Sequence, residues 1–170
     1  MSEWNEYLLS DIAKYTTGKL NSNAEVENGQ YPFFTCSPVT LKIDKYAFDI
    51  EALILAGNNT NGIISLKYFN GKFNAYQRTY IITIKDISIA NYKFIYYSLC
   101  IQLSSLERIS HGTATKYLTL PLLNQIPVFL PPLPEQKAIA SVLSSLDDKI
   151  DLLHRQNKTL EAIAEALFRQ

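Results

Sequence analysis

The sequence has few of the residues that build disulfide or metal sites. Its 170 residues include two cysteines, Cys36 and Cys100, and two histidines. The cysteines lie far apart in the chain, which excludes a disulfide framework and a cysteine-based zinc site at any familiar spacing. A chain of this length buries roughly 70% of its unfolded surface on folding, so it needs no such cross-links.

Long hydrophobic runs are also missing. The longest uncharged stretches are interrupted by Asn, Gly, Ser and Thr, so none is typical of a membrane-spanning helix. The N-terminus, Met1 to Glu6, lacks the basic and apolar regions of a signal peptide. We therefore expect a cytoplasmic protein with no membrane partner.

Neither sign of charge predominates in the chain. Sixteen Lys and Arg residues face sixteen Asp and Glu residues, and the formal net charge is +0. The total therefore does not indicate a strongly basic nucleic-acid-binding protein. The stretch from Lys67 to Lys116 nevertheless carries seven basic and two acidic residues, a net charge of +5. A local positive surface and an ordinary solvated surface are both compatible with that count.

Motifs for catalysis and for nucleotide binding are absent from the sequence. No glycine-rich stretch carries the lysine of a phosphate-binding loop, and there is no H-x-x-x-H, C-x-x-C or G-x-S-x-G. His111 and His154 are isolated. Asp147 and Asp148 are adjacent on a predicted helix, where such neighbours do not converge on one substrate. Nothing supports an enzyme active site, and we expect no metal and no cofactor.

The composition changes sharply near Pro131. Before it the sequence is rich in Tyr, Phe, Ile, Thr and Asn, and turn signals are frequent; after it Leu, Ala, Glu, Lys and Gln predominate. This change divides the chain into residues 1–130 and residues 131–170. We predict an α+β fold, in which a mixed domain is followed by a long C-terminal helix.

The predicted helix covers residues 134–168. Pro134 suits the first helical position, and Glu135 suits the positive end of the helix dipole. Apolar residues then recur at alternating spacings of four and three, the pattern of a coiled-coil seam, with the polar Asn157 inside it. An ordinary helix packed on its own domain is the alternative, with a wider apolar stripe. The seam positions are Ile139, Leu143, Leu146, Ile150, Leu153, Asn157, Leu160, Ala164 and Leu167.

The first 130 residues predict a mixture of short helices and strands. Asn70-Gly71 is the strongest hairpin signal, because a type I′ turn needs positive φ at both residues. The expected elements are a short helix at 8–13, strands at 52–56, 63–68, 73–76, 79–84 and 126–130, and a helix at 90–109.

Two loop clusters carry side chains that can contact nucleic acid. Asn and Gln can pair with adenine, whereas Arg and Lys can read guanine or hold phosphate, and small hydroxyl groups suit phosphate oxygens. Ordinary turn chemistry explains the same residue types, so both interpretations stay open. The candidates are Asn58, Asn59, Asn61, Lys67, Lys72, Gln77 and Arg78 in the first cluster, and Thr113, Thr115 and Lys116 in the second.

Residues 126–140, IPVFLPPLPEQKAIA, closely resemble the conserved region of type I restriction-modification specificity subunits. Residues 111–118, HGTATKYL, are similar to the motif that this family carries near the end of a target recognition domain. The opening, from Trp4 to Lys19, is similar to the start of the family, and residues 31–34 are similar to its early strand. The matches occur in the family's order and cover essentially the whole chain.

The resemblance implies a non-catalytic subunit that binds double-stranded DNA. Such subunits hold two DNA methyltransferase subunits, and restriction subunits join the complex. Each target recognition domain reads one half of a split target, and the conserved helices form an antiparallel coiled coil that sets the spacing. Recognition residues differ with the target, so the resemblance assigns no individual base contact.

The chain departs from the family in length, because a full specificity subunit holds two recognition domains and two conserved helices. Two explanations remain open. The chain is a half subunit that pairs with itself through its C-terminal helix, or it is an N-terminal fragment that lacks its partner. A coiled-coil assembly scaffold with a protein-binding N-terminal domain is the alternative function.

Overall fold

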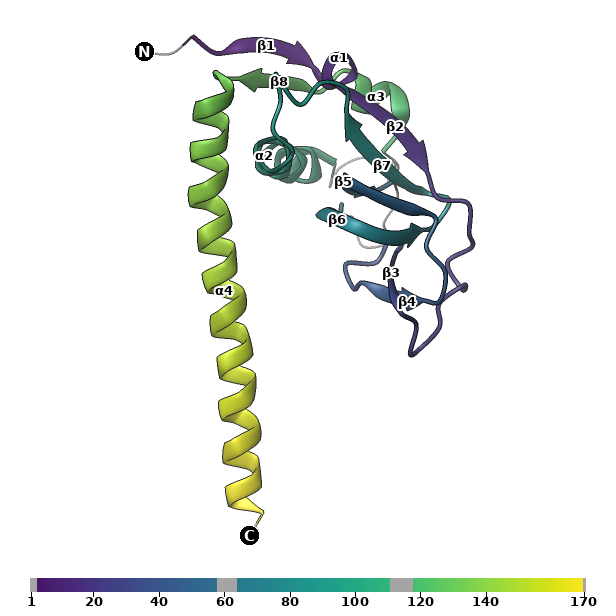
Figure 1. Ribbon diagram of the computed structural model, residues 1–170, viewed down its shortest axis with the longest axis vertical. Coiled ribbons are helices and arrows are strands. Elements are labelled where there is room, and N and C mark those ends of the chain that lie inside the picture. Colours follow the sequence, from purple (N-terminus) through teal and green to yellow (C-terminus); the bar gives the residue numbers. More distant parts are fainter. Residues whose placement is uncertain (1–2, 58–63, 111–117, 170) are drawn as a thin grey trace.

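The structure, a computed structural model, describes residues 3–57, 64–110 and 118–169. A mixed domain contains every strand, and one long helix extends far beyond it (Figure 1). The N-terminal strand lies at the same end of the molecule as the start of that helix. The elements are β1 (Asn5–Leu8), α1 (Leu9–Ile12), β2 (Ala13–Thr17), β3 (Tyr31–Phe34), β4 (Leu41–Ile43), β5 (Phe48–Ala56), β6 (Leu66–Ala75), β7 (Thr79–Ile84), α2 (Tyr92–Ser110), α3 (Leu120–Asn124), β8 (Pro127–Leu130) and α4 (Leu133–Phe168).

The strands form two sheets. The larger has six strands in the order β2-β7-β5-β6-β3-β4, and its neighbours are antiparallel except for the parallel pair β3 and β6. The smaller sheet pairs β1 with β8 in antiparallel register, Asn5 opposite Leu130. This pairing joins the N-terminus of the chain to the residues that lead into α4.

The connection that follows β2 packs against the end of β6. Leu20 forms an isolated bridge with Tyr76, although β2 and β6 are not neighbours in the sheet. Between them, Gly18 lies so close to β6 that an added Cβ would be 1.9 Å from the carbonyl oxygen of Ala75. Only glycine permits this approach, which brings the β2–β3 connection against the β6–β7 turn.

The two faces of the large sheet have different cores. On one face, Leu53, Leu55 and Ile82 pack against the apolar face of α2, whose buried residues include Leu99 and Leu103. The other face carries a separate and strongly aromatic cluster. That cluster consists of Phe34, Ala52, Ile54, Phe73, Ala75 and Ile81, with Phe48 and Phe69 packed beside it.

Several predicted elements are confirmed. The helix expected at 134–168 is α4, with bounds Leu133–Phe168, and the strand expected at 79–84 is β7. The predicted α+β class is also confirmed. Among the described residues, no helix combines the length and the apolar character needed to cross a membrane.

The hairpin turn predicted at Asn70-Gly71 is wrong. Both residues lie inside the ten-residue strand β6, where Asn70 is opposite Glu51 and Gly71 is opposite Ile50. Gly71 does have a positive φ of 133°, but in an extended strand rather than in a turn. The first half of β5, which the sequence did not predict, supplies the pairing partner. Long-range pairing therefore overrides the local turn signal.

Candidate nucleic-acid interface

The ends of the two candidate loops meet at Gly57. The amide of Leu118, just after the second loop, donates a hydrogen bond to the carbonyl of Gly57, just before the first, at 3.0 Å. The amide of Gly57 in turn donates to the carbonyl of Arg78 at 3.0 Å. The Tyr80 hydroxyl donates to the carbonyl of Leu118 at 3.2 Å. Three segments that are distant in sequence are thus tied together.

Gly57 is the residue that permits this convergence. An added Cβ would lie 2.7 Å from the carbonyl oxygen of Arg78 and 3.1 Å from the ring of Tyr80. Any side chain would therefore push the β6–β7 turn away from the end of β5.

The structure describes only some of the residues predicted to contact DNA. Gln77 and Arg78 are exposed on the β6–β7 turn. The Gln77 amide side chain donates to Oδ1 of Asn21 at 3.2 Å, and its backbone amide donates to the carbonyl of Leu20 at 2.9 Å. The turn is therefore held against the β2–β3 connection. Outside the described residues lie Asn58, Asn59, Asn61, Thr113, Thr115 and Lys116.

Lys67 and Lys72 do not lie together. Alternation along β6 places Lys67 on the face of the aromatic cluster, where its Nζ is 5.6 Å from the centroid of the Phe34 ring. The Lys67 Nζ also donates to the Thr40 hydroxyl at 2.9 Å, and partial burial lowers the pKa of the ammonium group. Lys72 is on the opposite face, with its Nζ 4.8 Å from the centroid of Tyr46.

Sequence reasoning missed the β3–β4 connection, residues 35–40, as part of this region. Its Thr40 contacts Lys67, and the Cys36 thiol lies 3.7 Å from the carbonyl oxygen of Arg78, to which it donates. The only local signal was its turn-forming composition, Ser37-Pro38 followed by Thr40, which is common to loops of every function.

The seam of α4 is exposed over most of its length. Ile139 packs against the core of the domain, and Leu143 is half-buried. From Leu146 onward the seam is open, with exposed fractions of 55% at Leu146 and 67% at Leu167. The other exposed members are Ile150, Leu153, Asn157, Leu160 and Ala164. A face of this kind is suited to pairing with a second helix.

Among the described groups whose pKa departs clearly from its ordinary value, most are tyrosines in which burial favours the protonated form. Burial, reinforced by the carboxylate of Asp11, raises the pKa of Tyr15 to about 12. Burial also raises the pKa of Tyr68 to about 12, helped by a 2.8 Å hydrogen bond from its hydroxyl to Glu51. Within the described ranges, no group of His, Cys, Asp and Glu is arranged to hold a metal ion.

Comparisons with known proteins place the chain among restriction-modification proteins. The family described as type I restriction modification DNA specificity domain matches residues 1–162. The EcoDI specificity subunit of Escherichia coli is 36% identical over 99% of the chain and 36% of its own length. The MjaVIII specificity subunit of Methanocaldococcus jannaschii is 26% identical over 98% of the chain and 42% of its own length. The chain thus spans well under half of these relatives.

The fold is shared with solved structures. The S subunit of a type I restriction-modification system from M. genitalium superimposes with a TM-score of 0.76 at 20% identity, over 89% of this chain and 41% of that one. The HsdS subunit from Thermoanaerobacter tengcongensis gives a TM-score of 0.57 at 18% identity, over 89% of this chain and 39% of that one. The family match over residues 1–162 and the similarity to the EcoDI subunit agree, and the chain belongs to the type I restriction modification DNA specificity domain family.

Proposed function

We propose that the chain is a DNA-recognition subunit that reads one half of a split double-stranded target for a type I restriction-modification complex. It takes no part in the chemistry, which resides in the methyltransferase and restriction subunits. Residues 1–130 form the target recognition domain, and residues 131–170 form the conserved helix. The convergence of three segments at Gly57 is the observation that carries this proposal.

Convergence supports recognition because base contacts must come from one compact surface. Arg78 and Gln77 are presented on a turn that is tied to the flanks of both candidate loops. The amide, hydroxyl and basic side chains of those loops suit base edges and phosphate oxygens. Binding residues are often carried by loops that a scaffold of regular secondary structure positions.

The exposed seam of α4 supports pairing of this helix with a second conserved helix. A monomer leaves five large apolar seam residues open to water, namely Leu146, Ile150, Leu153, Leu160 and Leu167. We infer that a second conserved helix covers them, supplied by another copy of this chain. The resulting two-fold dimer would hold two recognition domains at a fixed separation and read a symmetric split target.

Selection from a pool of randomised DNA duplexes tests the recognition role, with and without a type I methyltransferase subunit. We expect the enriched duplexes to share a short split motif and the affinity to fall steeply with salt, because phosphate contacts release counterions. Failure to enrich any sequence, with affinity independent of salt, would favour a coiled-coil scaffold with a protein-binding domain. Light scattering tests pairing separately, and a mass of twice 19.3 kDa is expected.

A further inference from the structure

Gln136 ties the first turns of α4 to the recognition domain. Its side chain is only 1% exposed, and both ends of its amide are used. Oε1 accepts a hydrogen bond from the backbone amide of Asn91 at 2.9 Å, while Nε2 donates to the carbonyls of Ile89 and Pro131 at 2.8 Å each. A buried amide whose oxygen and nitrogen both hydrogen-bond to backbone groups holds its neighbours in one geometry.

A second tie lies further along the helix. The hydroxyl of Tyr97, on α2, donates to the carboxylate of Asp147 at 2.7 Å and approaches the hydroxyl of Ser144 at 3.4 Å. Asp147 is eleven residues beyond Gln136, or about 16 Å along the axis at 1.5 Å per residue. Two attachments separated by this distance fix the direction of the α4 axis relative to the domain, which one attachment alone cannot do.

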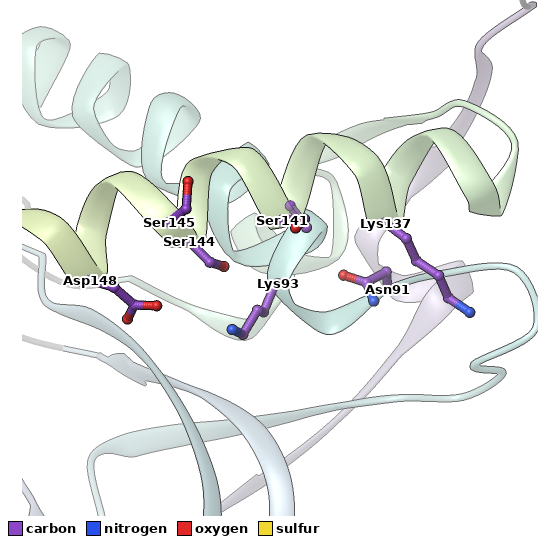
Figure 2. Close-up of a pocket in the computed structure, with 8 residues that line it drawn as sticks. Asn91, Lys93, Lys137, Ser141, Ser144, Ser145 and Asp148 are labelled. Atoms are coloured by element: carbon purple, nitrogen blue, oxygen red, sulfur yellow. The ribbon is translucent and has the colours of Figure 1, made fainter.

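Part of the surface between the two ties is an open pocket whose lining residues are mostly polar. This pocket has a volume of about 430 Å³ and is lined by residues of α4 and of the start of α2. Figure 2 shows Lys137 and Asp148 extending from the two ends of this stretch of α4, with Lys93 and Asn91 between them. The apolar contacts of α4 with the core are made by Ile139 and Ala140, close to the first tie.

We propose that Gln136 and the Tyr97–Asp147 pair are positioning residues that fix the angle between α4 and the recognition domain, and thereby the separation of the two half-sites. This inference rests on the proposed function. From Gln136 to Phe168 the helix measures about 48 Å, so a tilt of about 10° moves its far end by about 8 Å. That displacement exceeds two base-pair steps of about 3.4 Å each.

Residual dipolar couplings of backbone amides, measured for α4 and for the large sheet in one aligned sample, test the angle directly. In the wild-type protein both elements should fit a single alignment tensor. In Gln136→Met, which keeps the volume but loses the hydrogen bonds, the α4 couplings should shrink and require a separate tensor. Gln156→Met, on an exposed part of the same helix, is the matched control. A single shared tensor in Gln136→Met would overturn the proposal.

A second variant, at an exposed position, tests the proposal even if Gln136→Met does not fold. Asp147→Ala removes the acceptor of Tyr97 from an exposed position, and Asp148→Ala removes the adjacent carboxylate as a control. We expect Asp147→Ala to loosen the α4 couplings and Asp148→Ala to leave them unchanged. Equal behaviour of the two variants would remove Tyr97–Asp147 from the proposal.

Duplexes whose half-sites are separated by progressively longer spacers test the consequence for DNA. The wild-type protein should prefer one spacer length by about tenfold or more, equivalent to about 1.4 kcal/mol. Asp147→Ala should flatten that preference while keeping the same half-site sequence. A preference as sharp as that of the wild type would refute the spacing role. Absence of binding by the wild type at every spacer would instead refute the proposed function, and the couplings would still decide the angle.

Discussion

Replacing Leu153 by alanine should weaken the pairing of two α4 helices. Leu153 lies in the middle of the seam, and 44% of its surface is exposed in the single chain. Full burial of a leucine side chain is worth about 1.5–3 kcal/mol, so covering the exposed part contributes about 1 kcal/mol per helix. A symmetric dimer loses this contribution twice, or about 2 kcal/mol, which corresponds to a roughly 25-fold rise in the dimer dissociation constant.

The adjacent residue provides the control. Leu152 is 40% exposed, almost as much as Leu153, but it lies outside the four-three pattern of the seam. Leucine and alanine are both strong helix formers, so neither substitution should unfold α4. Leu152→Ala should therefore leave the dissociation constant within about twofold of the wild type, because it removes similar apolar area from a face that pairing does not cover.

Sedimentation equilibrium over a concentration series measures the dimer dissociation constants of both variants. Circular dichroism checks that their helix content is preserved. We expect a large difference between the effects of substituting these two neighbouring leucines. Equal weakening by both variants would mean that the apolar face is broader than the seam and that the helix does not pair as a two-stranded coil. A wild-type protein that remains at 19.3 kDa throughout would refute self-pairing altogether.

Other substitutions and conditions test separate parts of the structure. Arg78→Ala should lower DNA affinity and reduce the salt slope by about one if Arg78 holds a phosphate, as filter binding at several salt concentrations would show. Asn157→Leu should tighten helix pairing but loosen its register, visible as a higher dimer melting temperature together with mixed species in cross-linking. Gly18→Ala should destabilise the domain strongly in urea unfolding, because its Cβ would meet the carbonyl of Ala75 at 1.9 Å. The free energy of unfolding should fall as pH rises from about 10 to about 12, because folded Tyr15 and Tyr68 keep protons that the unfolded chain releases; a flat profile in urea titrations would contradict these raised pKa values.

The C-terminal helix could be predicted almost to the residue because its signals are local. The prolines before Pro134, the leucine-rich composition and the four-three spacing all act within a few turns of the chain. The same spacing predicts a coiled-coil seam. Its pairing stays a prediction, and the exposed fractions of Leu146 and Leu167 show that these positions are open in the single chain.

The features that could not be predicted depend on pairing between residues that are far apart in the sequence. Asn70-Gly71 has the local preference of a hairpin turn, but residues 48–51 pair with it and extend β6 through it. Lys67 and Lys72 seemed close in the sequence, yet strand alternation separates them onto opposite faces. Long-range pairing thus decided both features.

The meeting of segments at Gly57 was equally hidden from sequence reasoning. It joins Arg78 and Leu118, which no spacing rule relates to Gly57 or to each other. The local signal was a glycine at the end of an apolar strand, and that signal is shared by many ordinary turns. Candidate residues could therefore be chosen by their chemistry, whereas the convergence of the segments that flank the two loops required the fold.

Two polar residues of α4, Gln136 and Asn157, affect two different arrangements: that of the helix on its own domain, and that of the helix on a paired helix. A polar group removed from water costs free energy unless it finds a hydrogen-bond partner. Gln136 already has its partners within the chain, so its burial fixes how the helix leaves its own domain. Asn157 is exposed in the single chain and would be buried by pairing, so it favours those helix arrangements that supply a polar partner. Leucine at either position would add apolar contact but remove this selectivity, and the proposed spacing role requires a single helix geometry more than it requires added stability.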